Sequence, residues 1–494
     1  MSAKLATKFH QGKTVEDSLG KVILPPGAYY GISTHRALEN FPITNYQLHS
    51  ELIKALAMVK KAAAYANEKE LERKAPGIFK HIVNACDAII EGYYHEHFVV
   101  DPIQGGAGTS LNMNANEVIA NIALVEMGYE KCLDGVVSPY DHVNMSQSTN
   151  DVIPTAARIC IRKLLDELLQ TMSVLCDIFH EKSVEFDTVV KMGRTHLQDA
   201  VPIRLGQEFD AYVRVLKRDI DRISKTGSYL YDVNLGATAV GTALNANPDY
   251  VREVIGHLRR ISGLQDIRRC ESLVDGTQNT DCFTEVSAAL KICVINMSKI
   301  ANDLRLMASG PRCGLGEITM LKLQRGSSIM PGKVNPIIPE LINQVAFQVI
   351  GNDLTVSLAS EAGQLELNVM QPVLIYNLIQ SVSMMNNAFE VFGERCIKHI
   401  TISEQNRARI KSYVEESPII ATALTPYIGY ERAGAIARIA LEEKTTALDI
   451  CLQNESLINA LGGEDNLRKI LDPVSMTQMG ERLGENHDAG NFDG

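Results

Sequence analysis

Apolar residues recur at helical spacing over unusually long stretches of this chain, and this periodicity restricts its fold more than any other feature. One stretch carries apolar side chains three or four residues apart over about five turns. Its members are Ile161, Leu164, Leu165, Leu168, Met172, Leu175 and Phe179. Strand-like alternation is scarce, and further long helices are expected over 205–231, 281–309, 339–363 and 372–400. Helices of such length bury their apolar faces against one another, so the pattern predicts a helix bundle.

The overall composition excludes several classes of protein. The 48 Lys and Arg residues against 59 Asp and Glu give a formal net charge of −11, which argues against a nucleic-acid partner. No run of about eighteen apolar residues is present, so no membrane span is expected. Residues 1–13 lack the apolar core of a signal peptide, and residues 491–494 form no recognised address signal.

The ten cysteines are scattered along the chain and form no C-x-x-C pair. Several of them, including Cys160, Cys176 and Cys293, fall on the apolar faces of expected helices. We interpret them as buried thiols in a reducing compartment rather than as a disulfide framework or a zinc site. A cytoplasmic location is therefore expected.

Polar segments interrupt the helical pattern at or near the ends of long helices. Four of them stand out: 104–116, 147–154, 193–199 and 325–336. In the first, Thr109 and Ser110 are placed to cap a helix that begins near Leu111. In the second, Pro154 suits the first turn of the next helix. Free N–H groups and hydroxyls at a helix N-terminus can bind a carboxylate, although a simple cap is the plain alternative for each segment.

The third segment offers Thr195 and His196 side by side after a turn that starts at Gly193. A single histidine is usually structural, but this one lies between two long helices and next to a hydroxyl. His95 and His97 form another local pair, for which the sequence offers no third ligand. We therefore predict no metal site and keep Thr195 and His196 as candidate site residues.

The fourth segment, Arg325–Pro336, reads RGSSIMPGKVNP. Its glycines and the Pro331–Gly332 pair indicate a loop with unusual backbone geometry. Successive N–H groups in such a turn can form an anion-binding concavity, to which Lys333 adds a positive charge and Asn335 an amide. We interpret the segment as a mobile loop that closes on an anion and presents a serine hydroxyl to it. A serine-rich surface turn is the alternative, which the length of the run disfavours.

Together the four segments supply hydroxyls, amides, one histidine and one lysine. They supply no paired carboxylates, no phosphate-binding loop of the P-loop type and no convincing metal-ligand set. This set of donors suits a small dianion. It suits neither hydride transfer nor phosphoryl transfer.

Three of the segments resemble the signature blocks of the aspartase/fumarase superfamily, in the family's order and spacing. These blocks are Thr109–Asn114, Gly193–Asp199 and Gly326–Pro336, within a likeness that extends from about Ala28 to Gly480. The resemblance implies an all-α fold with a central bundle of long helices. It also implies a homotetramer whose active sites take residues from three subunits. The expected domains are a helical N-terminal domain, the bundle and a small helical C-terminal domain, at residues 1–147, 148–400 and 401–494.

Other segments are most similar to the aspartase branch of this superfamily. They are Ala28–Gly31, Arg36–Ile43, Asn335–Glu340, Val349–Asp353 and Glu361–Asn368. The resemblance implies a carbon–nitrogen lyase that reversibly eliminates ammonia from L-aspartate to give fumarate. Class II fumarase typically carries Thr-Gln where this chain has Ile337–Ile338. A fumarate hydratase acting on malate is the alternative, and a catalytically silent structural homologue is a third interpretation.

The resemblance also implies roles for individual residues. Ser327 would be the base, acting as an alkoxide, and His196 would be the second catalytic residue. The substrate would be bound by Thr109, Ser148, Thr149, Asn150, Thr195, Ser328, Lys333 and Asn335. No organic cofactor is implied. Activation by a divalent cation such as Mg²⁺ is compatible with the resemblance, although the sequence shows no ligand set for it.

Overall fold

The computed structural model describes residues 12–478, so most of the expectations for residues 1–13 and all of those for 491–494 lie outside it. The chain forms two compact units. Unit 1 contains the described residues up to 170 together with 219–294 and 345–386. Unit 2 contains 171–218, 295–344 and the described residues from 387 onward. The three predicted domain ranges stay a prediction.

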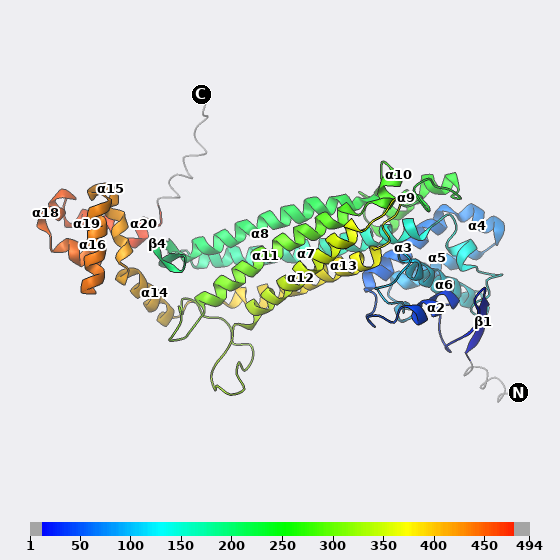
Figure 1. The fold of residues 1–494 in the computed structure, drawn as a ribbon, viewed down its shortest axis with the longest axis horizontal. Helices are drawn as coiled ribbons and strands as arrows, with labels where there is room; N and C mark the ends of the chain where they lie inside the picture. The colour runs from blue at the N-terminus through cyan, green and yellow to red at the C-terminus, as the bar shows by residue number, and fades with distance from the viewer. Residues whose placement is uncertain (1–11, 479–494) are drawn as a thin grey trace, which may run out of the picture. The chain divides into compact units, whose positions relative to one another are not determined.

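Long helices dominate the described chain, and the prediction of an all-α fold is confirmed (Figure 1). These helices are α7 (Thr149–Glu185), α8 (Leu205–Gly227), α11 (Asp281–Met307), α12 (Ile337–Glu361) and α13 (Gln371–Arg395). The apolar stripe predicted on α7, from Ile161 to Phe179, is buried. In unit 2, for example, the ring of Phe179 packs against the rings of Phe209 and Phe392, with its centroid 6.1 Å from each of theirs.

Unit 1 adds shorter helices and two small sheets. The helical elements are α2 (Ile32–Asn40), α3 (Ser50–Ala66), α4 (Glu68–Lys74), α5 (Ile78–Ile90), η2 (His95–His97), α6 (Thr109–Glu126), η3 (Pro139–Val143), η4 (Ser228–Tyr231), α9 (Pro248–Ser262) and α10 (Leu273–Gln278). The strands are β1 (Lys13–Asp17) antiparallel to β2 (Gly20–Leu24), and β5 (Asp232–Val233) parallel to β6 (Arg268–Arg269).

A carboxylate from far along the chain fixes the beginning of α2. Glu117, on α6, is 3% exposed and accepts hydrogen bonds from the amides of Gly31, Ser33 and Thr34 at 2.8, 2.8 and 3.1 Å. A carboxylate suits a helix N-terminus because it satisfies unpaired N–H groups and opposes the positive end of the helix dipole. Residues 12–50 are therefore more regular than their prolines and glycines indicate.

Unit 2 contains one β-hairpin and most of the short C-terminal helices. Its elements are β3 (Val190–Thr195), β4 (Gln198–Arg204), η5 (Ile397–His399), α14 (Glu404–Glu416), η6 (Pro418–Leu424), α15 (Thr425–Ile428), α16 (Tyr430–Glu443), α17 (Ala447–Leu452), α18 (Glu455–Ala460), α19 (Glu464–Ile470) and α20 (Pro473–Met476). Pro418, Pro426 and Pro473 each lie in the first turn of a short helix, as expected for breaks in the pattern.

The expectations about the cysteines and about a membrane span can be compared with the fold. All ten cysteines are free; Cys160, Cys176 and Cys293 are buried, whereas Cys313 is exposed and departs from the interpretation of buried thiols. Within residues 12–478, each helix is too short or too polar to span a lipid bilayer.

Candidate active site

Helix α6 begins at Thr109, two residues before the predicted position, and Thr109 and Ser110 do not cap it. The N-cap is Gly108, whose φ of +88° suits glycine. Instead, the Gln104 side chain accepts a hydrogen bond from the amide of Leu111 at 3.0 Å, and the Thr109 hydroxyl donates to the carbonyl of Gly106 at 2.7 Å. The cap prediction was wrong because a glutamine from the preceding loop takes that role. Thr109 therefore stands exposed on the first turn.

Helix α7 begins at Thr149, so Pro154 lies in its second turn and not in the first as predicted. A reciprocal cap sets this start: Ser148 Oγ accepts from the amide of Asn150 at 3.2 Å, and Asp151 Oδ1 accepts from the amide of Ser148 at 3.0 Å. Pro154 has no N–H to bond the carbonyl of Asn150. The Asn234 amide takes that carbonyl at 3.1 Å, so the helix continues through the proline.

Three candidate residues of unit 1, namely Ser148, Thr149 and Asn150, lie in a partly buried polar network. Asn112 donates to Thr149 Oγ1 and to Asn144 Oδ1, each at 3.2 Å, which brings together the two predicted segments 104–116 and 147–154. The Asn150 side chain donates to the carbonyl of Ala239 at 2.7 Å. The hydroxyls of Ser148 and Thr149 therefore lie at one helix start whose orientation is fixed from several sides.

The sequence analysis missed Lys60, which lies beneath this helix start. Lys60 is 1% exposed, and its Nζ donates to Asn144 Oδ1 and Gln147 Oε1, each at 2.9 Å. Burial lowers the pKa of Lys60 to about 7. Burial also raises the pKa of Asp151 to about 6, against hydrogen bonds from Ser148, Thr238 and Gly236 that lower it. The available signal was a lysine inside the apolar run of α3.

In unit 2, Thr195 and His196 lie at the tip of a β-hairpin, where only a break between helices was predicted. Thr195 pairs with Gln198 across the antiparallel strands β3 and β4. The two turn residues, His196 and Leu197, have φ values of +53° and +61°, the conformation of a type I′ turn. The predicted start of the turn at Gly193 was wrong, because Gly193 lies within β3 and the turn is formed by His196 and Leu197. Both Thr195 and His196 are exposed. The strands were missed because buried Lys191 disrupts their apolar alternation.

The segment 325–336 forms a loop, as predicted, and the two ends of the loop touch. A Cβ on Gly326 would lie 2.2 Å from the carbonyl oxygen of Lys333, so only glycine fits there. Asn335 Nδ2 donates to the carbonyl of Gly326 at 3.4 Å across the same closure. Inside the loop, Ser327 Oγ accepts from the amides of Ile329 and Met330 at 3.3 and 2.9 Å. These two donors stabilise negative charge on that oxygen.

A cavity of about 1010 Å³ in unit 2 is lined by the second half of this loop. Lys333 and Asn335 contribute to its wall, together with the cationic side chains of Arg305, Lys322 and Arg409. Its described lining contains no carboxylate. The surroundings of Lys333 therefore favour an anion.

The ten candidate residues are divided between the two units. Unit 1 carries four of them: Thr109, Ser148, Thr149 and Asn150. Unit 2 carries the other six: Thr195, His196, Ser327, Ser328, Lys333 and Asn335. Their individual roles stay predictions.

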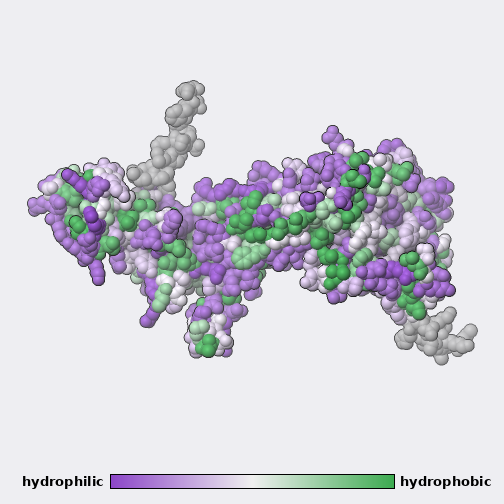
Figure 2. Space-filling view, viewed as in Figure 1, coloured by the Kyte–Doolittle hydropathy of each residue, from purple (hydrophilic) through white to green (hydrophobic). Residues whose placement is uncertain are grey.

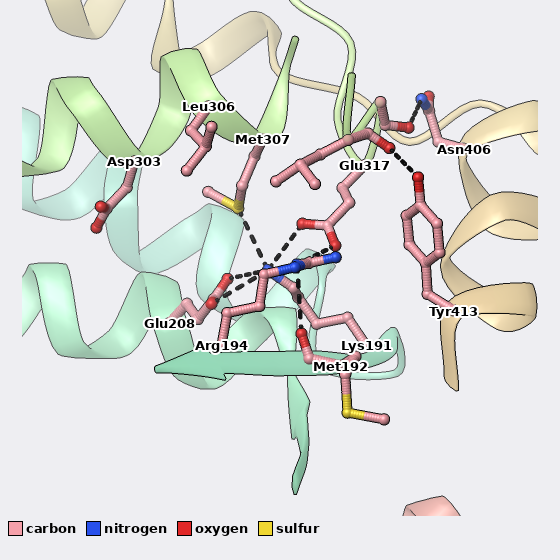
Figure 3. Close-up of polar contacts among 12 residues, drawn as sticks. Lys191, Met192, Arg194, Glu208, Asp303, Leu306, Met307, Glu317, Asn406 and Tyr413 are labelled. Atoms are coloured by element: carbon pink, nitrogen blue, oxygen red, sulfur yellow. Dashed lines mark hydrogen bonds and ion pairs between the residues drawn. The ribbon is translucent and has the colours of Figure 1, made fainter. Parts of the chain in front are cut away.

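A largely buried ion cluster, which the sequence analysis also missed, lies along strand β3 of the hairpin in unit 2 (Figure 3). We define it as Lys191 and Arg194 on β3, Glu208 on α8 and Glu317 after α11. The Glu317 side chain is fully buried; its Oε2 lies 2.8 Å from Lys191 Nζ and its Oε1 2.6 Å from Arg194 Nη1. The first contact is an ion pair without good hydrogen-bond angles. Burial raises the pKa of Glu208, against the opposing charge of Lys191.

Comparison with known proteins gives full-length matches. The family described as "Lyase" matches residues 20–351, and "Fumarase C C-terminus" matches residues 420–478. The chain is 59% identical over 465 residues to the aspartate ammonia-lyase of Bacillus subtilis (strain 168), which covers 94% of this chain and 96% of that protein.

Solved structures agree with these matches. A fumarate lyase:delta crystallin from Brucella melitensis bound to cobalt is 46% identical, with a TM-score of 0.89 and coverage of 94% of this chain and 99% of the other. A recombinant class II fumarase from Schistosoma mansoni is 32% identical, with a TM-score of 0.86 and the same coverage.

Proposed function

Because the chain belongs to the aspartase/fumarase family of lyases, we propose that it is a carbon–nitrogen lyase that reversibly eliminates ammonia from L-aspartate to give fumarate. The observation that carries this proposal is the contrast between two relatives of similar coverage. Identity is 59% to an aspartate ammonia-lyase and 32% to a class II fumarase. Both relatives span nearly the whole chain, so the difference concerns the entire fold and not one domain.

The elimination begins with removal of a proton from C3 of aspartate, beside one carboxylate. Ser327 in its alkoxide form takes this proton, and the electron pair moves into the carboxylate to give an aci-carboxylate. That intermediate then forms the C2–C3 double bond while the C–N bond breaks and ammonia leaves with the bonding electrons. A serine hydroxyl is a poor base unless its anion is stabilised. The amides of Ile329 and Met330, which point at Ser327 Oγ, support this role.

Hydroxyl and amide donors would hold the developing charge. Thr109, Ser148, Thr149 and Ser328 bind the carboxylate next to C3, and one such preorganised donor is worth about 3–4 kcal/mol. The place of Thr109 on the exposed first turn of α6 supports this assignment, because a helix N-terminus attracts an anion. Its hydroxyl would exchange its bond to the Gly106 carbonyl for one to the carboxylate.

The remaining candidates bind the other two groups of the substrate. Lys333 and Asn335 hold the second carboxylate, which the cationic lining of the neighbouring cavity supports. Asn150, Thr195 and His196 surround the amino group. Asn150 Nδ2 already donates to the carbonyl of Ala239, so the side-chain oxygen of Asn150 is the atom that would accept from an ammonium group. Closure of the 325–336 loop excludes water and gates turnover.

A homotetramer would complete the site from three subunits. Helix α12 supports this assembly because it exposes apolar side chains at helical spacing. Phe347, Ile350, Leu354 and Leu358 are 66, 37, 61 and 60% exposed in the single chain. Figure 2 shows such apolar surface along the long helices. A stripe of this kind marks a protein–protein interface.

The reaction as proposed uses only the protein's own side chains, without an organic cofactor. Activation by a divalent cation such as Mg²⁺ is part of the proposal, as is a cytoplasmic location. Magnesium dependence can be measured directly by comparing turnover after treatment with EDTA and after Mg²⁺ is restored.

The test of the function is absorbance in the fumarate band with purified protein and L-aspartate, then with L-malate. Fumarate from L-aspartate alone supports the ammonia-lyase. Fumarate from L-malate alone identifies a fumarate hydratase and contradicts the proposal. The absence of fumarate from both substrates would point to larger succinyl substrates or to a catalytically silent homologue.

A further inference from the structure

We propose that Glu317 is a positioning residue for the elimination: its buried carboxylate fixes the start of the loop segment 320–336 against strand β3. It thereby sets where Ser327 and the Thr195–His196 turn stand when the loop closes. The inference rests on the proposed function for its catalytic consequence. Its structural part concerns unit 2 alone.

Each carboxylate oxygen of Glu317 binds a different cation of the same strand (Figure 3). Oε1 lies 2.6 Å from Arg194 Nη1, and Oε2 lies 2.8 Å from Lys191 Nζ. Arg194 directly precedes Thr195, the last residue of β3. The contact therefore acts one residue away from the side chains that the hairpin presents.

The rest of the cluster leaves little freedom for another arrangement. Lys191 Nζ also lies 3.2 Å from both carboxylate oxygens of Glu208, and the Arg194 guanidinium lies over the ring of Tyr413, 5.6 Å from its centroid. Two cations thus face two carboxylates. A buried charge without its partner is strongly unfavourable, so these four groups stay together.

The backbone around Glu317 is held as firmly as its side chain. Its amide donates to the carbonyl of Met307, the last residue of α11, at 2.9 Å. On either side of it, Asn406 of α14 donates to the carbonyl of Gly316 at 2.7 Å and accepts from the Thr319 hydroxyl at 2.8 Å. Glu317 is therefore tied to α11, to β3 and to the neighbourhood of α14.

The anchoring ends where the irregular segment 320–336 begins. After the bridge between Thr319 and Thr401, residues 320–336 contain no helix or strand. Ser327 and Lys333 lie in this stretch, so their positions depend on where the chain leaves Thr319. A carboxylate that fixes this exit and the end of β3 together therefore holds two segments of this chain that carry predicted site residues.

The experiment compares Glu317→Gln with Asp353→Asn in the full chain. Asp353 is a matched control because it is 4% exposed, pairs with Lys291 Nζ at 2.6 Å and accepts from Ser287 Oγ at 2.8 Å. It lies in unit 1 and contacts none of the candidate site residues through these bonds. The measurements are kcat and KM for L-aspartate, the thermal unfolding midpoint, and the rate of trypsin cleavage after Lys322 and Arg325.

Both variants should lower the unfolding midpoint, because each removes a buried carboxylate from the cation that it pairs with. Only Glu317→Gln should lower kcat, by about tenfold or more with KM changed less than about threefold, and speed cleavage of the loop severalfold. Glu317→Asp, which keeps the charge, should recover part of kcat. If Glu317→Gln does not assemble, Arg194→Lys replaces it, with the same direction expected because it keeps the charge and loses the planar contact.

Two outcomes would overturn the inference. One is a kcat that falls no further in Glu317→Gln than in Asp353→Asn. The other is an unchanged rate of loop cleavage. Failure of the proposed function can be distinguished from failure of this inference. A wild-type protein that makes no fumarate from L-aspartate contradicts the proposed ammonia-lyase, whereas the cleavage rates still decide whether Glu317 holds the loop.

Discussion

Asn112 on α6 donates through Nδ2 to Thr149 Oγ1 on α7, over 3.2 Å. A hydroxyl that accepts this bond directs its own hydrogen elsewhere. Thr149 is thereby oriented as a donor, which is the state that a carboxylate ligand requires. The pair links two predicted polar segments, 37 residues apart in the sequence, within unit 1.

Replacing Asn112 with Ala should therefore raise KM for L-aspartate by about fivefold, the equivalent of one hydrogen bond of about 1 kcal/mol. The matched control is Asn114→Ala. Asn114 is buried on the same helix but bonds the backbone of His97 and Val99. Steady-state kinetics give KM for L-aspartate in both variants. An equal change of KM in the two would mean that the effect comes from packing of α6 and not from Thr149.

Replacing Ser327 with Ala should abolish turnover, with kcat reduced by about a thousandfold or more. The side chain is partly exposed in a loop without helix or strand, so the fold and the oligomer should be retained. Circular dichroism and size-exclusion chromatography check this. Ser328→Ala serves as the comparison and should retain more activity. A Ser327→Ala enzyme with near-normal kcat would remove Ser327 as the base.

Replacing Lys333 with Ala should greatly raise KM for L-aspartate, because an ionic contact with one substrate carboxylate is lost. Lys322→Ala is the control, since Lys322 lines the same cavity and makes the same change of charge. A direct ionic contact and the general positive field of the cavity are separated by measuring both variants at the same ionic strength and again with added salt. Added salt screens the general field more strongly than it screens a direct contact. Equal KM values in wild type and Lys333→Ala would contradict the carboxylate role.

Lys60 should make the protein more stable as the pH rises above neutrality. Burial lowers its pKa from 10.5 to about 7, so between these values the unfolded chain binds more protons than the folded one. The free energy of unfolding then increases with pH, with a limiting slope of about 1.4 kcal/mol per pH unit. The pKa of Asp151 is raised from 3.8 to about 6, so between these values the folded chain binds more protons than the unfolded one. In this lower pH range Asp151 therefore decreases the free energy of unfolding as the pH rises.

Urea unfolding at a fixed protein concentration, repeated from about pH 7 to about pH 10, tests this. Lys60→Met should flatten the rise. Lys54→Met removes another lysine from α3, one that is partly exposed and pairs with Glu51, and should keep the wild-type slope. A slope that is the same in wild type and Lys60→Met would show that other groups cause it.

Leu354→Asp should disrupt the tetramer, because it places a charge in the exposed apolar stripe of α12. Activity should fall together with the tetramer if the sites are shared between subunits. The control is Leu441→Asp on α16, a leucine that is 67% exposed and lies outside this stripe. Light scattering and turnover are measured at the same concentration. A Leu354→Asp protein of unchanged mass would argue against this interface.

The sequence predicted the long helices well because their stability comes from apolar faces that repeat every three to four residues. It located the four polar segments for a similar local reason, since glycine, proline and hydroxyl residues interrupt that repeat. Their detailed geometry was missed where the partner is remote. Gln104 and Glu117 satisfy helix N-termini from outside the expected capping positions, which local propensity does not encode.

Buried charged residues also limited what could be predicted from the sequence. Lys60 lies within an apolar helical run, and Lys191 faces the interior from a short strand, so each breaks the polarity pattern from which elements are predicted. Their partners, such as Glu317 for Lys191, are far away in the sequence. Pairing of this kind becomes visible only when the chain is folded.

The loop around Ser327 carries apolar side chains in water: Ile329 is 83% exposed and Met330 is 49% exposed. Closing the loop over a substrate buries apolar surface, and such burial gives a negative heat-capacity change. Calorimetry of ligand binding over a range of temperatures would therefore register the closure. Because hydrophobic burial weakens on cooling, the closed loop should become less populated in the cold, and substrate affinity should fall with it.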